Sequence, residues 1–256
     1  MFKRQIEYRG AMVVFFLSTL FHVGTGLLVW LSAENQTFPG FTKPELIGYY
    51  IVMIFMDWVL IWSMFNTIVE EIRNGDIQKD LIKPYSYFSL ILAKSASFHV
   101  SAAILYFVGA VVIYAAFTLS KAPVAIPTIP LEKLPVFLAA CAIAIMINFT
   151  FRFVLGLLAF WMTEVMFVDY AYYTIFPFLA CDVIPLSFFP ESVRSINSFL
   201  PFRYQLSFPL EIMFGKVDQM QIVYGLATGL VWWLVLYVVY KITWKIGSRS
   251  YMAFGQ

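Results

Sequence analysis

Long apolar runs alternate with short polar or proline-rich stretches along the chain, and this alternation predicts membrane-spanning helices. The runs cover residues 11–31, 46–68, 88–119, 134–161, 165–184 and 222–244. Each is at least as long as a helix must be to cross the hydrocarbon core, which takes roughly 20 residues, and the run 88–119 is longer than a span requires. We therefore predict an all-α integral membrane protein with six transmembrane helices, in which residues 1–256 form one transmembrane domain.

Composition agrees with this prediction. Of the residues, 61% are hydrophobic and 12% are charged, whereas soluble domains are about half apolar and a quarter charged. A soluble fold has too little interior for that much apolar surface, but a bilayer covers it. The net charge of +2 gives no reason to expect nucleic acid as a partner. Cys141 and Cys181 both fall in apolar runs, which favours two separate thiols over a disulfide.

Lysine and arginine indicate the orientation. They are concentrated at the N-terminus, in residues 69–84 and after the last run, all of which lie on one side if six helices alternate. Because positive charge is enriched on the cytoplasmic side, both termini are predicted to be cytoplasmic. The first run follows a basic flank but is too long for the apolar core of a signal peptide, so we expect it to be retained as a span.

Residues 185–220 are apolar but broken by Pro185, Pro190, Pro201 and Pro209. A proline inside a helix removes a hydrogen bond and clashes with the preceding turn. We therefore predict short outer helices here, re-entrant or interfacial, before the last span.

The most strongly patterned polar segment, residues 69–84, is called the elbow below. Gly75 is suited to end one helical turn and Asp76 to cap the next. Its candidate apolar anchors are Ile68, Ile72, Leu81 and Ile82. On pattern alone, the elbow is either a docking element for a soluble partner or a solvated loop at the membrane boundary.

Three segments together resemble the permease subunits of type-two ABC exporters, the ABC-2-type transporters. They are EIRNGDIQKDLIKP, IPLSFFPESVRSINSFLPF followed by SFPLEIMFG, and the terminal WKIGSRSYMAFGQ. The resemblance implies that the elbow is a coupling helix that contacts the ATPase subunit, through Glu70, Glu71, Arg73, Asp76, Lys79 and Leu81. It also implies an outer gate formed by Pro185, Phe188, Phe189 and Pro190.

The same resemblance implies partners and a location. A second permease, identical or related, would complete the pathway in a bacterial cytoplasmic (inner) membrane. No glycine of this chain begins a GxxxxGK[ST] phosphate-binding loop, so ATP and Mg²⁺ are expected on the ATPase subunits and no cofactor on this chain. We expect a transport subunit, not an enzyme, and the substrate stays open.

Charged residues inside the predicted spans need partners, because a lone charge at mid-bilayer costs on the order of 3 kcal/mol. Asp57 and Arg152 lie at comparable depth and are predicted either to form a structural ion pair or to line the pathway. Glu164 and Asp169 are expected at the solvated interface. His22 and His99 stand alone, which favours hydrogen-bonded core residues over metal ligands or a proton relay.

Two other functions compete with the exporter. An ion-gradient-driven secondary carrier would use Asp57, Arg152, Asp169 or the histidines as ion or proton sites. A membrane-embedded enzyme is the weakest candidate, since the sequence has neither an HExxH nor a GxSxG motif.

Gly225 and Gly229 form a GxxxG pattern in the last run, which predicts close helix packing.

Overall fold

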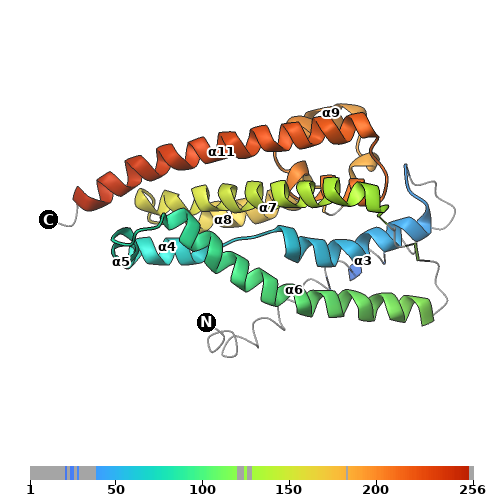
Figure 1. Ribbon diagram of the computed structural model, residues 1–256, viewed down its shortest axis with the longest axis horizontal. Coiled ribbons are helices and arrows are strands. Elements are labelled where there is room, and N and C mark those ends of the chain that lie inside the picture. The colour runs from blue at the N-terminus through green and yellow to red at the C-terminus, as the bar shows by residue number, and fades with distance from the viewer. Residues whose placement is uncertain are drawn as a thin grey trace.

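The protein, seen here as a computed structural model, is an elongated bundle of helices (Figure 1). Residues 39–119, 124–125, 129–182 and 184–253 are described, together with positions 21, 24, 25 and 28. The elements in this part of the chain are all helical. The long helices are α3 (Lys43–Leu60), α6 (Tyr87–Leu119), α7 (Leu134–Leu157) and α11 (Gln219–Ala253). The shorter ones are α4 (Phe65–Arg73), α5 (Gln78–Leu81), α8 (Met166–Leu179), α9 (Glu191–Phe199) and α10 (Ser207–Met213).

Three helical segments are long and apolar enough to cross a membrane: Lys43–Arg73, Leu131–Phe160 and Gln219–Arg249. They correspond to the predicted spans 46–68, 134–161 and 222–244. Helix α6 coincides with the predicted span 88–119, and its part Tyr106–Leu119 is a shorter apolar helix. The predicted first span, 11–31, lies outside the described residues apart from four positions. The all-helical membrane architecture is confirmed, and the number of six spans stays a prediction.

The predicted fifth span, 165–184, is shorter than expected. Helix α8 has 14 residues, which at 1.5 Å per residue is about 21 Å, less than the roughly 30 Å of a hydrocarbon core. Pro177 lies inside the helix near its end, and Cys181 then takes a left-handed conformation with φ of 58°. The backbone turns there, and the amide of Asp182 donates to the carbonyl of Pro177 at 2.9 Å.

Helix α7 is the centre of the bundle, since it packs against α11, α3, α4 and α10. Small residues on α7 let its neighbours come close. Ala140 and Ala144 are buried, and the side chain of Ile68 lies 3.1 Å from where a Cβ at Gly156 would stand. The remaining core is aromatic and aliphatic, with Phe149 and Phe153 of α7 packed against Phe88 of α6.

The segment that contains α3 and α4 is not one continuous helix. Thr42 and Glu45 form a capping box at the start of α3, with the backbone N–H of Thr42 donating to Glu45 at 2.8 Å. The helix ends at Leu60, residues 61–64 are non-helical, and α4 begins at Phe65. Irregular backbone at membrane depth is tolerated where protein surrounds it, and α7 packs beside both halves.

Short helices fill residues 185–220, as predicted. They are the 3₁₀ helix η3 (Leu186–Phe188), α9, the 3₁₀ helix η4 (Arg203–Gln205) and α10. Figure 1 places α9 at one end of the bundle and α4 and α5 at the other, beside the C-terminal end of α11. Further 3₁₀ turns, η1 (Leu131–Lys133) and η2 (Leu158–Phe160), flank α7.

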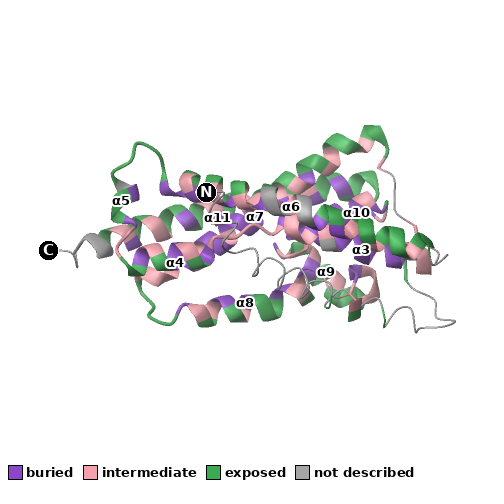
Figure 2. Ribbon diagram, turned by 90° about the horizontal axis from the view of Figure 1, so that it is seen from below, coloured by how far each residue is buried: buried purple, intermediate pink, exposed green. Residues whose placement is uncertain are grey.

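Much of the surface is apolar, as lipid contact requires. Figure 2 shows exposed residues along α8 and along α6. On α8 the exposed large apolar side chains include Phe167, Tyr170, Tyr173, Ile175 and Phe178. A soluble monomer seldom exposes so continuous an apolar face.

The GxxxG glycines are packing positions, as their spacing predicted. A Cβ on Gly225 would stand 2.2 Å from the ring of Phe208, and one on Gly229 would stand 2.9 Å from Ile143. We expect Gly225→Ala to destabilise the protein by about 1–3 kcal/mol, because the ring has to move. Thermal unfolding of the detergent-solubilised chain measures this, with Ala227→Val on an exposed position of α11 as the control. Equal melting temperatures for the two variants would contradict the packing role.

Candidate functional site

The elbow folds as a helix, a tight turn and a second short helix. Helix α4 buries Phe65, Ile68, Val69 and Ile72 along one face, and its C-cap is Asn74. Gly75 follows with φ of 80°, a conformation that favours glycine and reverses the chain toward α5. The predicted helix end at Gly75 is therefore confirmed.

Asp76 does not cap the next helix as predicted. The N-cap residue of α5 is Ile77, and no side chain forms a capping hydrogen bond to this helix. The carboxylate of Asp76 instead accepts a hydrogen bond from Lys79 at 2.5 Å, which raises the pKa of the Lys79 ammonium. This pair lies on the exposed side of the turn.

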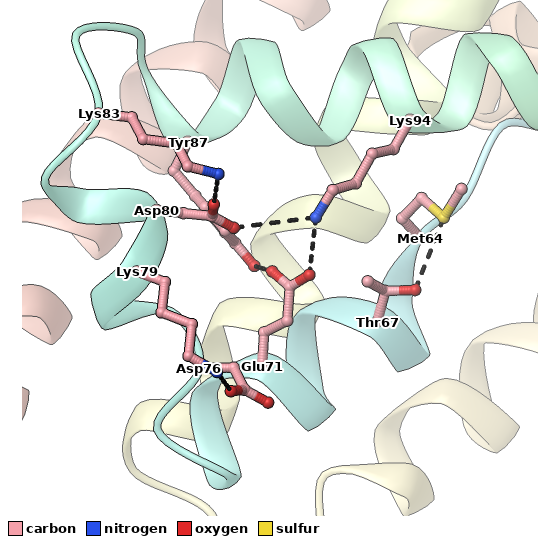
Figure 3. Close-up of polar contacts among 9 residues, drawn as sticks. All are labelled: Met64, Thr67, Glu71, Asp76, Lys79, Asp80, Lys83, Tyr87 and Lys94. Atoms are coloured by element: carbon pink, nitrogen blue, oxygen red, sulfur yellow. Dashed lines mark hydrogen bonds and ion pairs between the residues drawn. The ribbon is translucent and has the colours of Figure 1, made fainter. Parts of the chain in front are cut away.

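A charged cluster ties the elbow to the start of α6 (Figure 3). The ammonium of Lys94 lies 2.8 Å from a carboxylate oxygen of Glu71 on α4 and 3.8 Å from one of Asp80 on α5. Lys83 donates to the other oxygen of Asp80 at 2.5 Å. Lys94 of α6 thus bridges α4 and α5, the two helices of the elbow.

Tyr87 completes this cluster. Its hydroxyl donates to the second oxygen of Glu71 at 2.8 Å. Burial, together with this hydrogen bond to a carboxylate, raises the pKa of Tyr87, so the phenol stays protonated and remains the donor. Glu71 therefore has both oxygens engaged within the chain.

The outward surface of the elbow differs from the predicted one. Glu70, Arg73 and Lys79 are exposed, but Glu71 is turned toward α6. Ile82, expected to be an apolar anchor, is 86% exposed, while Ile68 and Ile72 are buried as predicted. Ile82 lies in the turn after α5, so helical periodicity did not place it on the inner face. For Leu81 the structure describes the backbone alone.

Lys94 should stabilise the fold of the elbow more than the exposed Lys79 does. We expect Lys94→Met to leave Glu71 and Asp80 without their shared cation and to speed backbone hydrogen exchange in residues 74–86. Lys79→Met removes an exposed pair of a kind typically worth less than about 1 kcal/mol, so it should leave exchange there nearly unchanged. Equal exchange rates in the two variants would show that the cluster does not brace the elbow.

A second polar centre surrounds Arg152 on α7, which is 2% exposed. Its guanidinium donates to Asp169 of α8 at 2.7 Å and to Ser63, in the break between α3 and α4, at 2.6 Å. It also lies 4.3 Å from the ring centroid of Tyr173, a cation–π distance. This single side chain joins α7, α8 and the helix break.

The predicted pairing of Arg152 with Asp57 is therefore wrong, and so is the expectation that Asp169 is solvated. Asp169 is 6% exposed and is the ion-pair partner of Arg152. The reason is position along α8. Asp169 lies in the first turn of α8, and its carboxylate lies 2.7 Å from the guanidinium of Arg152 on α7.

Polar side chains extend from this centre toward η4. Asn148 of α7 donates to Gln205 at 2.9 Å, and the hydroxyl of Tyr172 donates to the same Gln205 oxygen at 3.0 Å. All three are buried. His99 of α6 is also buried, with its ring stacked on Trp62 at a centroid distance of 5.6 Å and Nδ1 2.9 Å from the carbonyl of Ser95.

The predicted gate residues are divided between core and surface. Pro185 is buried and precedes η3, Phe188 packs against the core, Phe189 is half-buried, and Pro190 is exposed before α9. Beside them is a cavity of about 300 Å³ whose lining includes Arg194, Arg203 and Glu211. Each arginine has a carboxylate partner, Glu191 for Arg194 and Glu211 for Arg203.

A double-mutant cycle separates the two candidate partners of Arg152. Asp169→Leu alone leaves a buried cation unpaired and should cost about 3–5 kcal/mol, while Arg152→Met with Asp169→Leu should recover most of that loss. The corresponding cycle between Arg152 and Asp57 should give a much smaller coupling. Unfolding free energies of the purified variants provide the measurement, and a larger coupling with Asp57 would contradict the assignment.

The sequence matches the family described as ABC-2 family transporter protein over residues 17–255. No curated protein and no solved structure matches the chain.

Proposed function

The chain belongs to the ABC-2 family of transporter proteins, and from this premise we propose that it is the membrane permease subunit of an ATP-driven exporter. In this proposal separate ATPase subunits hold ATP and Mg²⁺, and the elbow receives their movement. The observation that carries the proposal is the elbow itself. It is a compact helical turn that is anchored to α6 on one face and exposes charged side chains and Ile82 on the other.

The proposed docking surface consists of Glu70, Arg73, Lys79 and Ile82. An exposed apolar side chain among charged ones is typical of a protein interface, where an apolar anchor enters a pocket and the surrounding charges set the orientation. Glu71 and Asp80 have a different role in this proposal. They connect the docking surface to α6 through Lys94.

Two routes lead from the elbow into the membrane domain. One passes through Lys94 along α6. The other passes through α4 to the break at residues 61–64, where Ser63 is bonded to Arg152. A break between two helices allows α4 to tilt without bending α3, because few backbone hydrogen bonds have to be broken there.

The pathway itself would form between two permeases. The exposed apolar face of α8 supports this part of the proposal, because a helix too short to span on its own is stabilised by a second membrane protein beside it. The elbow and both termini would be cytoplasmic in a bacterial inner membrane, by the distribution of lysine and arginine.

The secondary-carrier alternative loses support, since Arg152 and Asp169, two of its candidate ion sites, are engaged with each other.

Co-purification of this chain with the proteins encoded beside it, followed by identification of any ABC ATPase among them, tests the proposal. Arg73→Glu and Ile82→Asp should each weaken the complex about tenfold or more, as expected when an interface anchor is lost. Arg249→Glu, an exposed charge reversal near the end of α11, is the matched control. The decisive readouts are the amount of ATPase retained and the ATP hydrolysis rate of the complex.

Two outcomes would contradict the proposal. In the first, both elbow variants retain the ATPase as well as the control does. In the second, the chain purifies alone and moves substrate with an ion gradient, which would replace the exporter by a secondary carrier.

A further inference from the structure

A small pocket lies where the start of α6 meets the end of α11, apart from the docking surface. Its volume is about 240 Å³, and it opens to the surface. Polar groups and aromatic rings line it together: Asp80, Tyr85, Ser86, Tyr87, Tyr240, Lys241 and Trp244.

The rings that line the pocket are of the kinds that gather at the depth of lipid headgroups. Tyr87 and Trp244 stack with a centroid distance of 5.1 Å and an interplanar angle of 14°. Tyrosine and tryptophan gather at the membrane–water interface, where one end of each ring is apolar and the other is wet. The apolar segment of α11 that is long enough to span, Gln219–Arg249, has 31 residues. A hydrocarbon core takes about 20 residues, and Lys241 and Trp244 fall in the final third of the segment.

The charges around the pocket leave one ammonium without a partner. Asp80 is bound by Lys83 at 2.5 Å and by Lys94 at 3.8 Å, and Lys94 also binds Glu71. In the part of the chain that the structure describes, no carboxylate pairs with Lys241. Its ammonium instead lies 5.3 Å and 5.5 Å from the ring centroids of Tyr237 and Tyr240. Asp80 and Lys241 are the charged residues of the lining. The charge of Asp80 is already balanced by Lys83 and Lys94, so among the described residues Lys241 is left as the positive charge without a carboxylate partner.

We propose that this pocket binds the phosphate of an anionic phospholipid, with Lys241 as its principal ligand. The hydroxyls of Ser86 and Tyr85 are additional donors at the rim. Val238 and Ile242, both exposed on α11, provide an apolar surface for the acyl chains. A net negative headgroup fits the excess charge. A zwitterionic headgroup would bring an ammonium to a site whose carboxylate is already doubly paired.

This inference does not depend on the transport function, because it concerns binding by the chain alone. Asp80 of α5 and Lys241 of α11 both line the pocket, so a lipid in it would lie between the elbow and the last helix.

The test is a lipid titration of the full chain in dodecyl maltoside, followed by the thermal unfolding midpoint. Phosphatidylglycerol should raise the midpoint of the wild type more than phosphatidylcholine does. In Lys241→Gln the half-saturating mole fraction of phosphatidylglycerol should rise about fivefold, the effect of one lysine near an anionic surface. Lys245→Gln removes the same charge one turn further along α11 and outside the pocket, so it should behave as the wild type does. Lys241→Arg should restore binding.

Three results would overturn the inference: equal titrations for Lys241→Gln and Lys245→Gln, equal protection by phosphatidylcholine, or equal protection by inorganic phosphate, which would identify a free anion as the ligand. Equal midpoints of the two glutamine variants without lipid show that folding is intact. If Lys241→Gln does not fold, Tyr85→Ala at the rim decides the same question, because it should weaken phosphatidylglycerol binding while leaving the midpoint without lipid unchanged.

Discussion

The charge of Arg152 is the constraint on which the rest of the membrane domain depends. A guanidinium that is 2% exposed inside a helical bundle needs both a counter-charge and hydrogen-bond acceptors. Asp169 supplies the first, and Ser63 supplies an acceptor from a stretch where the backbone has left the helix. Through these two bonds, one side chain of α7 is joined to the first turn of α8 and to the interruption between α3 and α4. Irregular backbone at membrane depth is tolerated where protein surrounds it, and Ser63 of the break has such a protein partner in Arg152.

The partly buried charges of the elbow are also paired, although nearby water lowers the cost of leaving a charge there without a partner. Lys94 is shared by Glu71 and Asp80, and these partly buried pairs are screened less than the exposed pair of Lys79 and Asp76. The inward face of the elbow thus resists displacement relative to α6. Its outward face, where Ile82 stands among charged residues, gains little from the fold of its own chain. That contrast is the physical basis for assigning it to a partner.

Sequence alone predicted much of this architecture, because apolar runs of span length and proline-broken stretches are strong local signals. It placed the second, fourth and sixth predicted spans, the helical elbow with its glycine turn, and the short helices of residues 185–220. It could not choose a partner for Arg152, since Asp57 and Asp169 are both acidic and only the packing of α8 decides between them. It also overestimated the length of α8, because Pro177 and the turn at Cys181 end this helix inside an apolar run. The inward turn of Glu71 depended on Lys94, which lies 23 positions away.

The separation of the two faces of the elbow has a consequence for engineering. Residues that hold its shape contact other parts of this chain, whereas residues on its outward face contribute little to that shape. The outward face can therefore be rewritten without disturbing the scaffold beneath it. In the proposed role, a different set of side chains at positions 70, 73, 79 and 82 would change which ATPase the elbow binds and would leave the fold of the elbow unchanged.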